Sequence, residues 1–252
     1  MRKFLKIVTV TGADDSVRAD ELIAIAKEYP FVEFGILLSR SYFPNGRSRF
    51  PSGAWKSENL WRLSQAGVRL SGHLCGKYVR DVLHGDWSVI RMEPTHWHYF
   101  ERFQINTHGE QFSASNLRWP LYPGGREIIF QLDEVNDNFL PTAQELGYRA
   151  TGLFDLSHGA GVLPQEWPSA CSLWIGYAGG LGPANVAEQL DRIEKVAGKE
   201  AWIDAETKVR SDNGLRFDVD KAAAFLEEAK PWVIEGFNRS LKTYPNLSEY
   251  AQ

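Results

Sequence analysis

Short β-rich runs alternate with longer helical patterns along most of the chain. Eight runs rich in Val, Ile, Leu and aromatic residues predict strands at 5–11, 32–39, 68–75, 102–108, 127–133, 150–156, 173–180 and 201–207. Between most of them, apolar residues at helical spacing predict helices, the clearest at 16–29, 139–148, 183–198 and 218–230.

This alternation predicts the fold class. Strands that alternate with helices are typical of βαβ units, which build a parallel sheet. Eight units in 252 residues match the length of about 250 residues that is usual for a closed (β/α)8 barrel. We therefore predict an α/β fold, a single TIM-barrel domain over residues 1–252, in preference to an open doubly wound sheet.

Two stretches interrupt the alternation. Residues 40–57 form a long basic segment after the second strand, and residues 109–126 form an aromatic and proline-rich segment after the fourth. Both follow the carboxyl ends of strands, where barrels build active sites. We expect long loops here, either functional lids or crossovers with poorly formed helices.

Polar residues gather near the carboxyl ends of the predicted strands. Residues two apart on a strand share a face, and unpaired buried charges are costly, so this gathering predicts a catalytic rim. The alternative is that these groups pair with one another, or with Lys208 and Arg210, to fill the top of the barrel. The set comprises Ser71, His73, Cys75, Gln104, Asn106, His108, Gln131, Asp133, Asp155, Asp204 and Glu206.

Composition excludes several partner classes. A formal charge of -4 and a pI near 5.9 disfavour a nucleic-acid-binding surface, and no stretch approaches the ~18 apolar residues of a membrane span. The basic and then apolar N-terminus is interpreted as a first strand, not a signal peptide. Cys75 and Cys171 form no disulfide framework, which favours the cytoplasm. The sequence leaves open whether the protein forms a homodimer.

Metal and cofactor signals are weak. The pairs "HLC" at 73–75 and "HWH" at 96–98 have ligand-like spacing. The segments "GYAGGLG" and "HGAGVLP" both miss the dinucleotide fingerprint, and a nucleophilic Cys75 with His73 lacks a third orienting group. We expect no cofactor and no metal. A metal-dependent hydrolase or lyase using His73, His108 and the rim carboxylates remains an alternative.

The stretch "GYAGGLGPANVAEQL" at 176–190 places Gly179 and Gly180 directly after the seventh strand. Pro183 suits the first turn of the helix that follows. Barrels commonly bind phosphate at this strand, and glycines allow backbone N–H groups to approach an anion near a helix N-terminus. We predict an anion site here; a simple tight turn is the alternative.

Several motifs resemble the phosphoribosylanthranilate isomerase family. The segment "IGYAGGLGPANVAEQL" is similar to its strand-seven pattern L-A-G-G-L-x-P-x-N-V, and "GLFDLSHGAGVLPQEWP" is similar to its L-L-D-S…G-G-T-G pattern. The segment "WIDAETKVRSDNGLRFDVDKAAAFL" resembles V-D-V-S-S-G-V-E…G-x-K-D, and "LKIVTVTGADD" and "FGILLS…SRFPS" resemble the first two strands with their loops. The similarity touches nearly the whole chain.

The resemblance implies roles for individual residues. The family opens a ribose ring and moves a proton between neighbouring carbons, which requires a general acid and a general base. Asp155 matches the family's acid, Asp204 its strand-eight aspartate, and Arg49 the arginine that receives a substrate carboxylate. The implied phosphate-binding residues are Gly159, Gly161, Gly179, Gly180 and Lys208.

Two departures indicate a different reaction. Val8 stands where the family has its cysteine base. Residues 206–210, with the sequence ETKVR, stand where the family has S-S-G-V-E on strand eight. We therefore predict a divergent relative that performs isomerase or lyase chemistry on a small, phosphorylated or otherwise anionic, sugar-like substrate. Asp133, His73 or His108 would replace the base, and Glu206 and Asn106 would contact substrate. A barrel that binds a ligand without converting it remains the second alternative.

Overall fold

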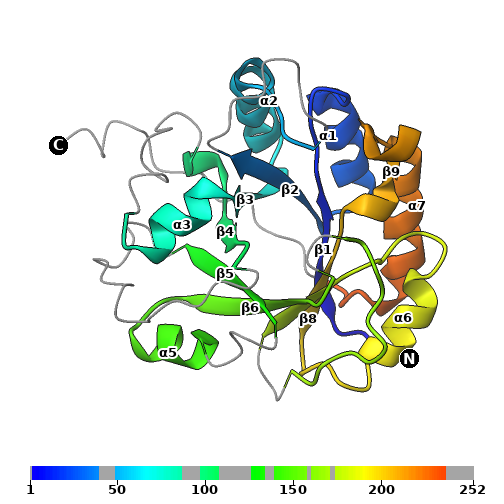
Figure 1. Ribbon diagram of the computed structural model, residues 1–252. Coiled ribbons are helices and arrows are strands. Elements are labelled where there is room, and N and C mark those ends of the chain that lie inside the picture. The colour runs from blue at the N-terminus through cyan, green and yellow to red at the C-terminus, as the bar shows by residue number, and fades with distance from the viewer. Residues whose placement is uncertain are drawn as a thin grey trace.

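The computed structural model describes residues 2–39, 49–86, 97–107, 126–133, 139–157, 160–170 and 174–236. In it, parallel strands close into a barrel in the order β1 to β8 (Figure 1), which confirms the predicted fold. The strands are β1 (Leu5–Thr11), β2 (Val32–Ser39), β3 (Arg69–Cys75), β4 (Arg102–Ile105), β5 (Glu127–Leu132), β6 (Ala150–Asp155), β7 (Ile175–Ala178) and β8 (Ala201–Ala205).

Helices cover the outside of the barrel (Figure 1). The α-helices are α1 (Ala19–Glu28), α2 (Gly53–Gln65), α3 (Lys77–Leu83), α5 (Phe139–Glu145), α6 (Val186–Ile193) and α7 (Val219–Ala229). Shorter elements are the 3-10 turns η1 (Trp97–Tyr99), η3 (Thr207–Val209), η4 (Asp212–Gly214) and η5 (Lys230–Trp232), and the hairpin β9 (Arg210–Ser211) with β10 (Arg216–Phe217). Within the described ranges, no helix is long and apolar enough to cross a membrane.

Several predicted boundaries were wrong. The strands β3 to β8 are shorter than expected by one to four residues; β4, for example, ends at Ile105, not at residue 108. The helix expected from Pro183 starts at Val186, because residues 183–185 form a turn. The loop expected over 40–57 ends early, because the Ser52 hydroxyl accepts a hydrogen bond from Trp55 N at 3.1 Å and caps α2.

Other expectations lie outside the described residues. These are residues 40–48 of the first long loop, all of the second except Arg126, and the chain beyond residue 236. The extent of the domain over 1–252 therefore stays a prediction.

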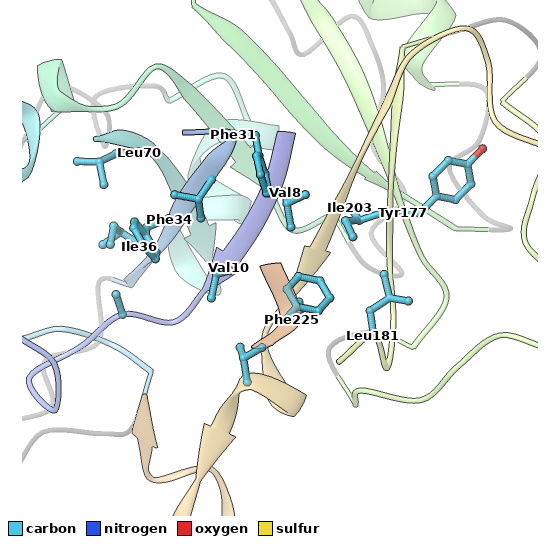
Figure 2. Close-up of a cluster of buried hydrophobic side chains, with 14 of the residues drawn as sticks. Val8, Val10, Phe31, Phe34, Ile36, Leu70, Tyr177, Leu181, Ile203 and Phe225 are labelled. Atoms are coloured by element: carbon cyan, nitrogen blue, oxygen red, sulfur yellow. The ribbon is translucent and has the colours of Figure 1, made fainter. Parts of the chain in front are cut away.

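The main hydrophobic core lies between the barrel and its helices. Val8 and Val10 of β1 belong to it and are buried with Phe34 and Ile36 of β2 and Phe225 of α7 (Figure 2). Because side chains alternate along a strand, the intervening residues of β1 face the barrel interior. This alternation fixes which residues can reach a site inside the barrel.

The amino-terminal floor of the barrel interior is charged. Arg102 on β4 donates to both carboxylate oxygens of Glu33 on β2, at 2.7 and 2.9 Å, and to Glu127 on β5 at 3.1 Å. Its guanidinium lies 4.6 Å from the ring centroid of Trp202 on β8. A small apolar layer above the floor comprises Ile7, Ile129, Leu153, Ala178 and Trp202. These two layers occupy the lower barrel, below the carboxyl ends of the strands.

Candidate active site at the carboxyl end of the barrel

A cavity of about 280 Å³ opens at the carboxyl ends of β3 to β8. It brings together residues that are far apart in sequence, most of them polar. The predicted site residues that line it are Asn106, Asp155, Gly161, Gly179, Gly180, Asp204, Glu206 and Lys208. The cavity therefore contains both the carboxyl groups and the glycine loop that the sequence singles out.

Asp155 and Asp204 flank β7 at the same height. Ala178 of β7 pairs with Asp155 on one side and with Asp204 on the other, and neighbouring strands lie roughly 4.8 Å apart. Asp155 is held by three donors: Ser157 N at 3.1 Å and Ser157 Oγ at 2.7 Å reach Oδ1, and Gln131 Nε2 at 3.2 Å reaches Oδ2. Its carboxyl group is thus fixed in orientation at the cavity.

Asp204 has a different environment. It is buried, and Thr11 on β1 donates a hydrogen bond to its Oδ1 at 2.8 Å. Burial raises the pKa of Asp204 well above its usual range; the Thr11 hydrogen bond opposes this, and the nearby carboxylates of Glu206, Glu33 and Asp155 add to it. Its environment therefore favours the protonated form.

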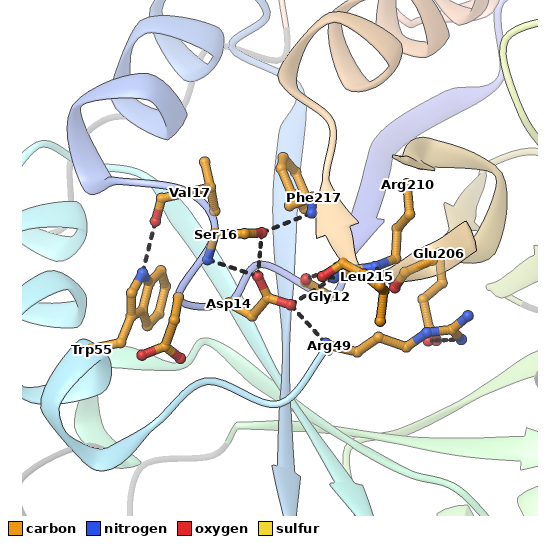
Figure 3. A network of polar contacts seen from close by, with 12 residues as sticks. Gly12, Asp14, Ser16, Val17, Arg49, Trp55, Glu206, Arg210, Leu215 and Phe217 are labelled. Carbon is orange, nitrogen blue, oxygen red and sulfur yellow. Dashed lines mark hydrogen bonds and ion pairs between the residues drawn. The ribbon is translucent and has the colours of Figure 1, made fainter. Parts of the chain in front are cut away.

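Glu206 lies two residues beyond Asp204 and points toward Arg49. The Arg49 Nη1 donates to Glu206 Oε1 at 2.7 Å, and the Glu206 side chain is 27% exposed (Figure 3). Burial raises the pKa of Glu206, although the charges of Arg49 and Arg210 act in the opposite direction. Arg49 itself is not among the residues that line the cavity.

The glycine loop after β7 is shaped by close packing. Gly179 and Gly180 have φ of 115° and 67°, a region that favours glycine. A Cβ on Gly180 would lie 2.6 Å from Leu163 N, so the loop packs directly against the backbone of residues 161–163. Asn185 closes the turn, because its Nδ2 donates to Gly180 O at 3.0 Å. The loop is thus a tight turn that also forms one wall of the cavity.

Lys208 supplies positive charge beside this loop. Its side chain is exposed, it lines the cavity, and it makes no ion pair with another described residue. A Cβ on Gly182 would lie 2.5 Å from Lys208 Cβ, which shows how closely the two segments approach. Lys208 therefore places a positive charge at this end of the cavity.

Two of the proposed replacement bases lie away from the cavity lining. His73 is buried inside the barrel, 2.9 Å from Ser71 Oγ, and burial lowers its pKa to about 4. Asp133 is buried directly after β5 but does not line the cavity. His108, Gly159 and His96 lie outside the described residues. His98 lies in η1, before β4, and therefore at the opposite end of the barrel.

Other candidate chemistry finds little support in the geometry. Among the residues whose placement is described, no group of three or more His, Cys, Asp or Glu side chains is arranged to hold a metal ion. Cys75 lines the cavity and accepts a hydrogen bond from Asn106 Nδ2 at 3.3 Å. Burial, with the charge of Glu206, raises the pKa of its thiol to about 12, so Cys75 is not an activated nucleophile.

The position of Val8 corrects the strand-one comparison. Val8 belongs to the outer core beneath the helices (Figure 2). A cysteine at this position would therefore point away from the cavity. The residue of β1 that reaches the site is Thr11, through its hydrogen bond to Asp204.

Sequence reasoning missed four residues that build the site: Thr11, Asp14, Ser157 and Thr207. Thr11 had a signal, because it shares a strand face with Thr9, a second polar residue on a largely apolar strand. Asp14, Ser157 and Thr207 lie beyond the ends of strands, where no strand periodicity shows which way a side chain points.

Comparison with known proteins supports the fold. No family model matches the chain, and no curated protein matches it. Among solved structures it is similar to N-(5'-phosphoribosyl)anthranilate isomerase from Pyrococcus furiosus, with 16% identity and a TM-score of 0.50 over 89% of this chain and 98% of that one. It is also similar to phospho-2-dehydro-3-deoxyheptonate aldolase from Thermotoga maritima, with 11% identity and a TM-score of 0.51 over 91% of this chain and 69% of that one. The chain thus has a barrel fold like that of phosphoribosylanthranilate isomerase.

Proposed function

We propose that this protein is a barrel enzyme of isomerase or lyase type that acts on a small anionic, sugar-like substrate by general acid–base catalysis. One observation supports the proposal most strongly: Asp155 and Asp204 face the same cavity from either side of β7, beside a glycine loop and Lys208. Carboxyl groups in unlike environments suit the two halves of an acid–base reaction.

The surroundings of the two aspartates suggest their roles. Asp204 favours its protonated form and is suited to donate a proton, for example to a ring oxygen. Asp155 accepts hydrogen bonds at both carboxyl oxygens and is suited to receive a proton from a substrate carbon. Resemblance to the isomerase family instead gives the acid role to Asp155. In either assignment the pair carries the proton transfer.

The anionic end of the substrate is proposed to bind at Lys208. Gly161, Gly179 and Gly180 line the same end of the cavity, where a bound group can approach the backbone closely. One structural neighbour is named for a phosphoribosyl compound, which makes phosphate the first anion to test.

The first test is a titration with inorganic phosphate by calorimetry. Lys208→Gln is expected to weaken binding about tenfold, in line with roughly 1.5 kcal/mol for a hydrogen bond to a charged group. Lys27→Gln, an exposed residue in the last turn of α1, is the control and should leave affinity unchanged. No binding by the wild type, or equal loss in both variants, would overturn the anion site.

The second test measures proton transfer without knowledge of the full reaction. Aldose phosphates are incubated with the protein in D2O, and exchange of the carbon-bound hydrogen is followed by NMR. Asp155→Asn and Asp204→Asn are each expected to slow exchange by about 100-fold or more, the usual contribution of a general acid or base. Phosphate binding without any wild-type exchange would favour the barrel that binds a ligand without converting it.

A further inference from the structure

Arg49 is held in place from two directions (Figure 3). Its side-chain Nη1 donates to Glu206 Oε1 at 2.7 Å and to Thr207 Oγ1 at 3.4 Å. Its backbone N–H donates to Asp14 Oδ2 at 2.6 Å. The residue therefore connects the loop after β1 with the wall of the cavity after β8.

The backbone of Arg49 is strained. Its φ is 81°, a left-handed conformation that a residue with a side chain rarely adopts. Such strain persists only where the surrounding contacts fix it, and it is concentrated at functional sites. The hydrogen bond to Asp14 is one contact that holds this conformation.

Asp14 is itself anchored. Its Oδ2 also accepts a hydrogen bond from Arg210 Nη2 at 2.6 Å, and its Oδ1 accepts one from Ser16 N at 3.0 Å (Figure 3). Burial alone would raise the pKa of Asp14, but the hydrogen bonds from Ser16 and Arg49 and the charge of Arg210 outweigh it and lower the pKa. An ionised Asp14 thus joins the loops that follow β1, β2 and β8.

We propose that Arg49, anchored by Asp14, is a positioning residue that holds the Glu206 carboxylate in the cavity wall, where it accepts a hydrogen bond from a hydroxyl or amino group of the substrate. This rests on the proposed function, since it requires that the cavity bind a small substrate. It replaces the carboxylate-binding role that family resemblance implies for Arg49. The Arg49 guanidinium already donates hydrogen bonds to Glu206 and Thr207. A substrate carboxylate would therefore have to displace the Glu206 carboxylate.

The charge of Glu206 limits which groups of a substrate can lie beside it. An anionic group of the ligand beside Glu206 would be repelled, whereas a hydroxyl or amino group would be bound as a hydrogen-bond donor. The ligand therefore carries its anionic group at the Lys208 end and a hydroxyl or amino group at Glu206. The charged and titratable groups that face Glu206 are Arg49, Arg210, Asp155, Asp204 and Cys75, with Lys208 on the same wall.

Arg49→Gly tests the positioning role with the least disturbance. Glycine adopts a positive φ without strain, and the variant keeps the backbone N–H that binds Asp14. The titration of Glu206 is followed by NMR with carboxyl-labelled glutamate, and the signal is assigned with Glu206→Gln. The pKa of Glu206 is expected to rise by about one unit or more, because a nearby opposite charge is lost.

Asp14→Asn should shift the Glu206 signal in the same direction. Asp15→Asn is the matched control: Asp15 is adjacent, but its carboxylate accepts from Ser52 N and Ser52 Oγ, not from Arg49. An unchanged Glu206 titration in Arg49→Gly, or an equal shift in Asp15→Asn and Asp14→Asn, would overturn the positioning role. If Asp14→Asn does not fold, Arg49→Gly still decides the question.

The substrate contact is tested with two probes, inorganic phosphate and ribose 5-phosphate. In the wild type, ribose 5-phosphate should bind more tightly, because its hydroxyl groups reach Glu206. Arg49→Gly should weaken ribose 5-phosphate about tenfold and inorganic phosphate less than about twofold, whereas Lys208→Gln should weaken both. Equal affinity of the wild type for both probes would overturn the contact at Glu206. Failure to bind phosphate at all would instead overturn the anion site, and the Glu206 titration would still stand as a separate result.

Discussion

At the scale of single residues, the site depends on carboxyl groups placed in unlike surroundings. Asp204 is buried and accepts a hydrogen bond from the Thr11 hydroxyl, whereas Asp155 is held by Ser157 and Gln131 at the cavity edge. Burial of the Asp204 carboxyl group makes its ionisation costly in the folded state. This cost makes stability depend on pH.

The variant Asp204→Asn is predicted to reveal that dependence. The pKa of Asp204 is raised in the folded state, so the folded state binds its proton more tightly than the unfolded chain. Stability of the wild type is therefore lost as pH rises from the usual carboxyl range toward the raised pKa. The variant has no such proton to lose, so its stability relative to the wild type should increase with pH across that window.

Urea unfolding at several pH values above 4 measures this difference. Asp191→Asn, an exposed residue on α6, serves as control and should differ from the wild type by a constant amount. A difference between Asp204→Asn and the wild type that stays flat with pH would show that Asp204 is not perturbed.

At the scale of elements, the loop between β7 and α6 combines a structural role with the proposed anion site. The sequence offered a tight turn and an anion site as alternatives for this loop. The structure shows that the turn is real and that it faces the cavity. The glycines are required by packing, because Gly180 lies against the backbone of Leu163.

Gly180→Ala is predicted to destabilise the protein and deform the cavity. The new Cβ would lie 2.6 Å from Leu163 N at a φ of 67°, and strain of this kind costs on the order of 1–3 kcal/mol. Gly53→Ala is the control, because a Cβ there meets nothing within 4 Å in the first turn of α2. Thermal unfolding should show a lower Tm for Gly180→Ala alone; equal Tm values would contradict the packing argument.

At the scale of the whole molecule, the barrel is divided into a filled lower half and an open upper half. The floor depends on Arg102, which is buried between Glu33 and Glu127. Removing one partner of a buried ion pair leaves an uncompensated charge. The floor therefore contributes to stability at a distance from the site.

Arg102→Met is predicted to cost about 3–5 kcal/mol of unfolding free energy, because Glu33 is left buried without its partner. Arg62→Gln breaks the exposed ion pair with Asp20 and should cost less than about 1 kcal/mol. Urea denaturation measures both. A similar small loss in the two variants would show that the interior network is well hydrated.

The fold could be predicted from sequence because alternating strand and helix patterns arise from burial on both faces of a parallel sheet. The ends of the strands could not be predicted, because polar residues continue a strand-like pattern beyond the last paired residue. Asn106, for example, directly follows Ile105, where β4 ends. The site carboxyls were visible as polar positions on strands. The contacts of Asp14 with Arg49 and Arg210 join three separate loops, and no local pattern encodes them.

The most direct test of the central claim is a crystal structure of the protein grown with inorganic phosphate. We expect a phosphate ion in the cavity at the carboxyl end of the barrel, in contact with Lys208 and the backbone of Gly179 and Gly180, with the Asp155 and Asp204 carboxyls facing the open space beside it. A cavity without phosphate at saturating concentration, or a phosphate bound only outside it, would rule out the proposed anion site.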